Sequence, residues 1–214
     1  MERGLFVVLE GIDGAGTTTQ VGRLVARLRA EGVDARGSRE PSDGPIGTLA
    51  RHILTGRVVC PNGKAPSWMM MALLFAADRM DHVESEVEPL VMSGGVVVSD
   101  RYDASSIGYQ SAMSGAETPS AVEWIRSLNR YARRPDLTVV LDVSAEVAAE
   151  RRSARGEAAQ LYEQNEFQRT LAQFYRELPR HMAHDRVVVV DGNGTVEAVH
   201  GRVYDAYRSA FAGR

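Results

Sequence analysis

The chain of 214 residues lacks the features that mark several large classes of protein. It has one cysteine, Cys60, so it can form neither an internal disulfide nor a cysteine-based metal cluster. Its apolar runs, such as Leu5–Leu9, are far shorter than the roughly 20 residues that span a membrane. Its formal charge of −3 provides no basic field for a nucleic-acid backbone. We therefore expect a cytoplasmic protein that binds neither nucleic acid nor membrane.

Lysine is almost absent as well. Lys64 is the only one, so 24 of the 25 basic side chains are arginine. Arginine stays protonated and binds oxyanions through paired N–H donors, so any recognition of phosphate has to rest almost wholly on arginine. The apolar share of 44% and the charged share of 25% are those of an ordinary globular chain.

Five short, mostly β-branched runs alternate with helical patterns along the chain. We predict strands at Leu5–Glu10, Asp34–Arg39, Gly95–Asp100, Leu137–Val143 and Arg186–Asp191. Such alternation favours an α/β fold in three layers, with a parallel sheet of about five strands and helices on both faces. No linker or repeat divides residues 1–214, so we expect a single domain. Ligands of such sheets bind at the carboxyl ends of the strands.

Apolar residues at helical spacing predict four of the helices. Their stripes are Val21, Leu24, Val25 and Leu28; Met70, Leu73, Leu74 and Ala77; Phe167, Leu171, Phe174 and Leu178; and Val196, Val199, Val203 and Tyr207. We expect each stripe to face the core.

A glycine-rich turn follows the first predicted strand and opens the first helix. Its residues are Gly11, Ile12, Asp13, Gly14, Ala15, Gly16, Thr17 and Thr18, with the G-x-x-x-x-G spacing of a P-loop. Backbone amides in such a turn converge on phosphate, and Thr18 stands where a hydroxyl ligates Mg²⁺. The P-loop position for lysine holds Thr17, which has a hydroxyl but no charge.

Three further groups of residues follow the P-loop. They are Arg39-Glu40-Pro41, Phe75-Ala76-Ala77-Asp78-Arg79, and Asp100-Arg101-Tyr102 with Ser105-Ser106 and Tyr109-Gln110. In this order they resemble the bacterial thymidylate kinase family of P-loop nucleoside monophosphate kinases, over nearly the whole chain. The resemblance implies the P-loop kinase fold, transfer of the γ-phosphoryl group of ATP to dTMP with Mg²⁺, and a homodimer.

The resemblance also implies roles for individual residues. Phe75 stacks on thymine; Arg79, Ser106 and Gln110 bind its edge; Tyr109 packs near the deoxyribose; Asp13 bonds the 3′-hydroxyl; Glu40 helps to hold the acceptor; Arg51 and Arg101 clamp the monophosphate; and Asp100 lies near Mg²⁺ with Thr18. The catalytic set implied in this way is Arg101, Arg155 and Asp13.

The chain departs from the family pattern at the P-loop and in the lid, at about residues 150–162. Because Gly14 occupies the P-loop position that holds an arginine in some members, the lid should supply the transition-state arginine. Arg155 is the first candidate, followed by Arg151 and Arg152, although Ala159-Gln160 replaces the usual Asp-Arg pair.

Three explanations of the missing lysine stay open. A lid arginine can replace it; Lys64, ranked lower, can replace it; or transfer is slow and the protein mainly binds nucleotide. Another nucleoside monophosphate kinase is the alternative enzyme, although the residues around Phe75 favour thymine over a purine.

Overall fold

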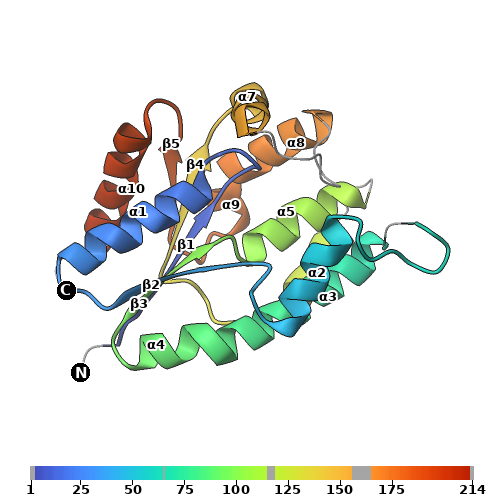
Figure 1. Cartoon of the computed structure of the whole chain (residues 1–214), viewed down its shortest axis with the longest axis horizontal. Helices are drawn as coiled ribbons and strands as arrows, with labels where there is room; N and C mark the ends of the chain where they lie inside the picture. Colours follow the sequence, from blue (N-terminus) through green and yellow to red (C-terminus); the bar gives the residue numbers. More distant parts are fainter. Residues whose placement is uncertain (1–2, 65, 115–118, 156–164, 213–214) are drawn as a thin grey trace.

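The structure is a computed structural model and describes residues 3–64, 66–114, 119–155 and 165–212 (Figure 1). The strands are β1 Leu5–Glu10, β2 Ala35–Arg39, β3 Val96–Asp100, β4 Leu137–Asp142 and β5 Val187–Asp191. The helices are α1 Thr17–Ala30, α2 Pro45–Leu54, α3 Trp68–His82, the π-helical turn η1 Val83–Val87, α4 Glu88–Met92, α5 Asp103–Met113, α6 Pro119–Leu128, α7 Ala145–Arg155, α8 Asn165–Arg176, α9 Leu178–His181 and α10 Val196–Ala210.

All five strands are parallel and pair in the order β2-β3-β1-β4-β5. Each predicted strand is confirmed to within one residue at either end. The continuous apolar runs are explained by burial on both faces, as expected for a parallel sheet. Every residue of β1 is buried, for example.

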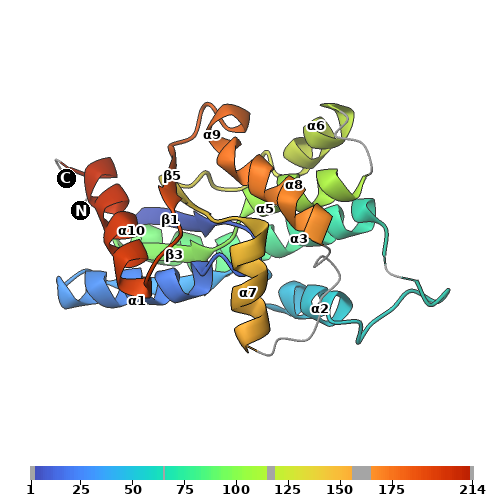
Figure 2. The same ribbon diagram turned by 90° about the horizontal axis from the view of Figure 1, so that it is seen from above.

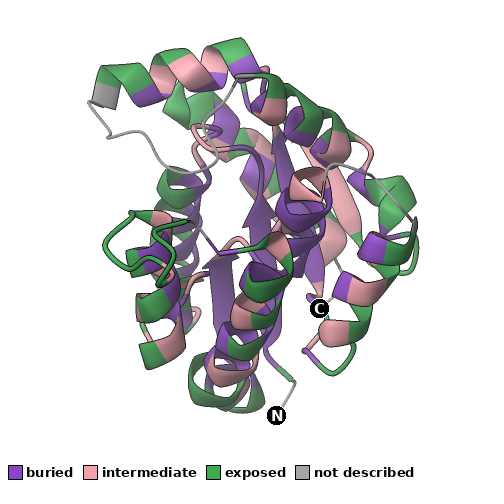
Figure 3. Ribbon diagram, turned by 90° about the vertical axis from the view of Figure 1, so that its right-hand side faces the viewer, coloured by how far each residue is buried: buried purple, intermediate pink, exposed green. Residues whose placement is uncertain are grey.

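Helices cover both faces of the sheet, which confirms the three-layer α/β architecture. Figure 2 shows α1 on one side of the sheet and α8 and α9 on the other. In Figure 3 the sheet is mostly buried, and the exposed residues lie on the outer faces of the helices. Within the described part of the chain, no helix is long and apolar enough to cross a membrane.

The stripe predicted for α3 is wrong, whereas the stripe of α1 is buried as predicted. Met70 and Leu73 of α3 are 45% and 51% exposed. The buried face of this helix instead contains Asp78, Arg79 and His82. Periodicity failed here because the buried face of this helix presents polar side chains that hydrogen-bond to neighbouring elements.

The sheet places three loops at one edge. Arg39 of β2 pairs with Asp100 of β3, which in turn pairs with Leu9 of β1. The segments after Glu10, Arg39 and Asp100 therefore begin side by side, at the carboxyl ends of the strands where open α/β sheets bind ligands.

Candidate functional site

The loop between β1 and α1 has the backbone geometry of an anion-binding turn. Gly14 and Gly16 have φ values of 95° and 99°, a region that other residues rarely adopt. A Cβ atom on Gly14 would also lie 2.4 Å from the carbonyl oxygen of Ala148, so only glycine fits. Gly16 caps α1, whose first amides have no side-chain cap. These amides and the helix dipole can bind phosphate.

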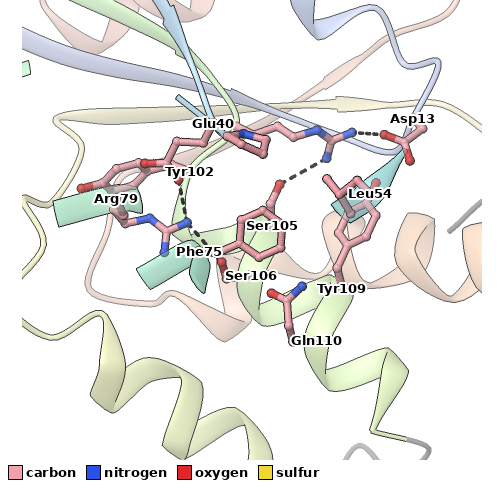
Figure 4. A pocket seen from close by; sticks show the side chains of 12 residues that line it. Asp13, Glu40, Leu54, Phe75, Arg79, Tyr102, Ser105, Ser106, Tyr109 and Gln110 are labelled. Carbon is pink, nitrogen blue, oxygen red and sulfur yellow. Dashed lines mark hydrogen bonds and ion pairs between the residues drawn. The ribbon is translucent and has the colours of Figure 1, made fainter. Parts of the chain in front are cut away.

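Two cavities flank this loop. The first is lined by Asp13, Glu40, Pro41, Leu54, Phe75, Arg79, Arg101, Tyr102, Ser105, Ser106, Tyr109 and Gln110 (Figure 4). The second is lined by loop residues Gly14, Ala15 and Gly16 together with residues of α1, α7 and the β5–α10 segment. After the roles that the resemblance implies for their residues, we call them the acceptor cavity and the donor cavity. The acceptor cavity contains every predicted substrate-binding residue except Arg51.

Arg79 is fully buried and is fixed in place by side chains from other elements. Its Nη2 atom donates to Glu40 Oε2 at 2.6 Å and to Ser106 Oγ at 3.1 Å, as Figure 4 shows. Its Nη1 atom donates to Asn129 Oδ1. Nε is buried without a partner among the described residues. The guanidinium group is therefore held in one orientation, with its Nε–H donor unsatisfied among the described residues.

His82 forms hydrogen bonds to Glu40 through one ring nitrogen and to Ser38 through the other. Its ring is fully buried, and Nδ1 lies 3.2 Å from Glu40 Oε1. Nε2 is hydrogen-bonded to Ser38 Oγ, which also lies 3.2 Å from Glu86 Oε2. Since ionised Glu40 can only accept, Nδ1 carries the proton. His82 thus orients the carboxylate that binds Arg79.

Arg101 links the acceptor cavity to the P-loop. It has a φ of 74°, the one positive value among the described non-glycine residues. Nη2 donates to Asp13 Oδ1 at 2.6 Å, and Nη1 donates to the carbonyl oxygen of Gly11 at 2.8 Å. Nη1 also donates to Ser105 Oγ at 3.2 Å. The guanidinium thus lies between the P-loop and the start of α5.

Glu10 is a buried carboxyl group beneath Arg101. Burial raises its pKa to about 7, against the opposing effects of the Arg101 charge and of hydrogen bonds from Ser105 and Tyr102. Oε1 accepts the Tyr102 N–H at 2.9 Å, and Oε2 accepts the hydroxyl groups of Ser105 at 2.7 Å and Tyr175 at 3.1 Å. Glu10 therefore fastens the turn that contains Arg101 to the end of β1.

Thr18 and Asp100 form a pair suited to a hard cation. The Thr18 hydroxyl donates to Asp100 Oδ2, whereas Asp100 Oδ1 is buried without a partner among the described residues. An unsatisfied buried carboxylate oxygen beside a hydroxyl matches the preference of Mg²⁺ for oxygen ligands. No group of three or more acidic, histidine or cysteine side chains suited to a metal occurs in the described residues. The chemistry of this pair would therefore fit a Mg²⁺ ion.

Arg51 is placed outside the acceptor cavity. Its Nη1 atom donates to the carbonyl oxygens of Pro41, at 2.7 Å, and Ser42. Nη2 bonds Thr48 Oγ1 at 3.2 Å and pairs with Asp43 at 3.3 Å. In this arrangement Arg51 stabilises the segment that presents Glu40 and Pro41.

Two of the three candidate lid arginines contact the P-loop from α7. Arg151 donates to the carbonyl oxygens of Ala15 at 3.1 Å and Gly192 at 3.0 Å. Arg152 donates to the carbonyl oxygen of Asp13. The third, Arg155, ends α7, and its side chain lies outside the described part, as do residues 156–162 of the predicted lid.

Sequence reasoning missed three residues that hold the site together. Asn129, Glu10 and Tyr175 contact site arginines or their partners from positions far apart in the chain. Asn129 and Tyr175 belong to no motif found in the sequence. Glu10 carried one signal, since a charged residue closes an otherwise apolar strand directly before the P-loop.

Comparison with known proteins gives consistent matches along the chain. The family model described as "Thymidylate kinase" matches residues 9–203. A "Probable thymidylate kinase" of Pyrococcus abyssi is 37% identical over 198 residues, which cover 92% of this chain and 93% of the relative. A "Thymidylate kinase" of Caulobacter vibrioides is 36% identical over 211 residues and 96% of each chain. One of Halothermothrix orenii is 35% identical over 209 residues, covering 94% and 95%.

Proposed function

Because the chain belongs to the thymidylate kinase family, we propose that its acceptor cavity holds dTMP and that its P-loop holds the phosphates of ATP. The chain is a dTMP kinase, which makes dTDP. The observation that carries this assignment is a cavity beside a P-loop in which an aromatic ring, a fixed guanidinium and an unpartnered amide oxygen line the same space.

Thymine recognition rests on Phe75, Arg79 and Gln110, with Ser106 supporting the guanidinium. The Phe75 ring offers a face for stacking on the base. Arg79 Nε is a buried donor and Gln110 Oε1 a buried acceptor, both unpartnered within the described residues. Thymine presents carbonyl acceptors and one imide N–H, which match that donor and that acceptor. A buried polar group left unpaired disfavours a base without the match.

The sugar and phosphate of dTMP belong at the other end of the cavity. Arg101 binds the monophosphate, and the Asp13 carboxylate accepts a hydrogen bond from the 3′-hydroxyl after exchanging part of its contact with Arg101. Tyr109, buried against this end, disfavours a 2′-hydroxyl. Arg51 assists by holding the Pro41–Ser42 backbone and reaches the monophosphate only if it exchanges those bonds.

The donor phosphates bind the loop amides, and Thr18 and Asp100 would hold Mg²⁺ directly or through water. When bound, Mg²⁺ neutralises charge on the phosphate oxygens. An oxygen of the dTMP phosphate forms the new bond to the γ-phosphorus, while the bond to the β–γ bridging oxygen breaks and ADP leaves. The protein's contribution is alignment and charge stabilisation by Arg101 and a lid arginine, for which Arg155 stays a candidate.

We also propose a cytoplasmic homodimer that associates through α2 and α3. Leu49 of α2 and Met69, Met70 and Leu73 of α3 are each 43–51% exposed, on two helices that pack together. Contiguous exposed apolar side chains favour contact with a second copy of the chain. Light scattering during gel filtration tests this, because the Met70→Glu variant should elute as a monomer.

The experiment for the catalytic proposal is an ADP-release assay with ATP, Mg²⁺ and one deoxynucleoside monophosphate at a time. Turnover with dTMP should far exceed turnover with dCMP, dAMP and dGMP. Preference for another monophosphate would point to a different nucleotide kinase. Nucleotide binding without turnover would point to a protein that only binds its ligands.

A further inference from the structure

The phosphate site lacks the positive charge that a P-loop normally supplies. Thr17 holds the lysine position and is buried. Lys64 lies between α2 and α3, in a segment that projects away from the β1–α1 loop in Figures 1 and 2. Any side-chain charge that compensates for the missing lysine therefore comes from arginine.

Arg152 is the described arginine best placed for this role. Figures 1 and 2 show α7 beside the β1–α1 loop, and Arg152 of this helix is 8% exposed. Its Nη1 atom donates to the carbonyl oxygen of Asp13. Among the described residues this is its one hydrogen bond, so four of its five N–H donors have no protein partner.

The position of this contact along the loop is informative. Asp13 lines the acceptor cavity, whereas the next residue, Gly14, lines the donor cavity. A phosphoryl group that moves between the two cavities has to pass the Asp13–Gly14 segment. Arg152 is attached to the backbone at that boundary.

The neighbouring arginines are already committed to other contacts. Arg101 bonds the Asp13 carboxylate and the Gly11 carbonyl on the acceptor side. Both terminal nitrogens of Arg151 bond backbone carbonyl oxygens, and this side chain lines the donor cavity. Arg152 lines neither cavity itself, but it alone of the three combines a bond to the backbone at their boundary with mostly unpartnered donors among the described residues.

We propose that Arg152 replaces the P-loop lysine and neutralises the β- and γ-phosphates of the donor during transfer. The inference rests on the proposed kinase function. A guanidinium is suited to this because it cannot lose its proton and can contact two phosphate oxygens together. The competing explanation is that Arg152 only braces the Asp13 backbone.

Substitutions of Arg152 distinguish a role of its charge at the phosphates from a role in supporting the Asp13 backbone. The Arg152→Gln variant keeps an amide that can donate to the Asp13 carbonyl but loses the charge, and Arg152→Lys keeps the charge. We expect kcat to fall by about 10²–10³ in R152Q and by less than tenfold in R152K. The matched control is Arg169→Met, which removes an exposed arginine of α8 outside both cavities and should leave kcat unchanged.

Adding a lysine to the P-loop makes the test decisive. If charge is what Arg152 provides, Thr17→Lys should raise kcat at least tenfold more in R152Q than in the wild-type chain. A lysine at position 17 cannot rescue a lost brace, so equal effects in both backgrounds would overturn the inference. Wild-type kcat in R152Q would also overturn it.

Two further measurements keep the outcome interpretable. Thermal unfolding of each variant checks that it folds. If R152Q does not fold, the test uses R152K instead and compares kcat of R152K with and without T17K. Adding T17K should then raise kcat by less than threefold, because Arg152→Lys already supplies the charge. A larger increase contradicts the proposal. A wild-type chain without dTMP-dependent turnover would refute the proposed function instead, which distinguishes the two failures.

Discussion

Replacing Glu10 by glutamine should remove part of the pH dependence of the free energy of unfolding. The carboxyl group is fully buried, and its pKa is raised from 4.5 to about 7 because burial disfavours the charged form. A glutamine side chain at this position would have the same size, would keep an oxygen for the Tyr102 N–H, and would place an amide beside two hydroxyl groups that can reverse their hydrogen bonds. The substitution therefore removes the ionisation with little change in packing.

The direction in which the Glu10 contribution to stability changes with pH follows from proton binding. Between its unfolded pKa of 4.5 and its folded pKa of about 7, Glu10 binds more protons in the folded chain. Its contribution to stability is thus complete below pH 4.5 and is lost as the pH rises through 7. A shift of about 2.5 units corresponds to ~3.4 kcal/mol in total, of which about 2.5 kcal/mol falls between pH 5 and pH 8.

Urea denaturation of the ligand-free wild type and E10Q at pH 5, 6, 7 and 8 measures this effect. The free energy of unfolding of the wild type minus that of E10Q should fall by about 2.5 kcal/mol over this range. Subtraction cancels the titration of all other groups. The control is Glu197→Gln, at an exposed surface pair with Arg23, for which the difference should be flat. A difference for E10Q that is flat or rises with pH would refute the reasoning.

Three further predictions concern the acceptor cavity and the metal pair. Phe75→Ala should raise KM for dTMP about tenfold by removing a stacking face, while KM for ATP stays the same; equal changes in both would contradict base stacking. His82→Asn, which can still donate to the carboxylate of Glu40, should keep KM for dTMP within threefold, whereas His82→Phe should raise it about tenfold; similar kinetics of the two variants would mean that His82 does not orient that carboxylate. Asp100→Asn should raise the Mg²⁺ concentration at half-maximal rate, and an unchanged Mg²⁺ dependence would remove Asp100 from the metal site.

The sheet and the P-loop could be predicted because their signals are local. Continuous β-branched runs such as Val96–Val98 have few alternatives to a buried strand. Gly14 is required by its own φ value and by the nearby Ala148 carbonyl, and the glycine spacing reflects that requirement. Neither inference depends on how distant segments pack.

The remaining parts of the site depend on contacts between residues that are far apart in the sequence. Arg79 and Asn129 are 50 residues apart, and Glu10 and Tyr175 are separated by 165. Arg51 has the same difficulty, because its reach into the cavity depends on how α2 is turned against the Pro41–Ser42 segment. Such partners become visible only when the helices are placed on the sheet.

The sequence pattern predicted the wrong buried face for α3, and the cause is functional. Turning Met70 and Leu73 outward exposes apolar area in a single copy of the chain and buries Arg79 and His82. Buried ion pairs contribute little net stability, because desolvation offsets much of their attraction. Stability therefore does not explain why Glu40, Arg79 and His82 lie inside. The arrangement is explained if the fixed Arg79 is needed to bind the base, since sequence rules fail most often where a site requires strained or buried polar groups.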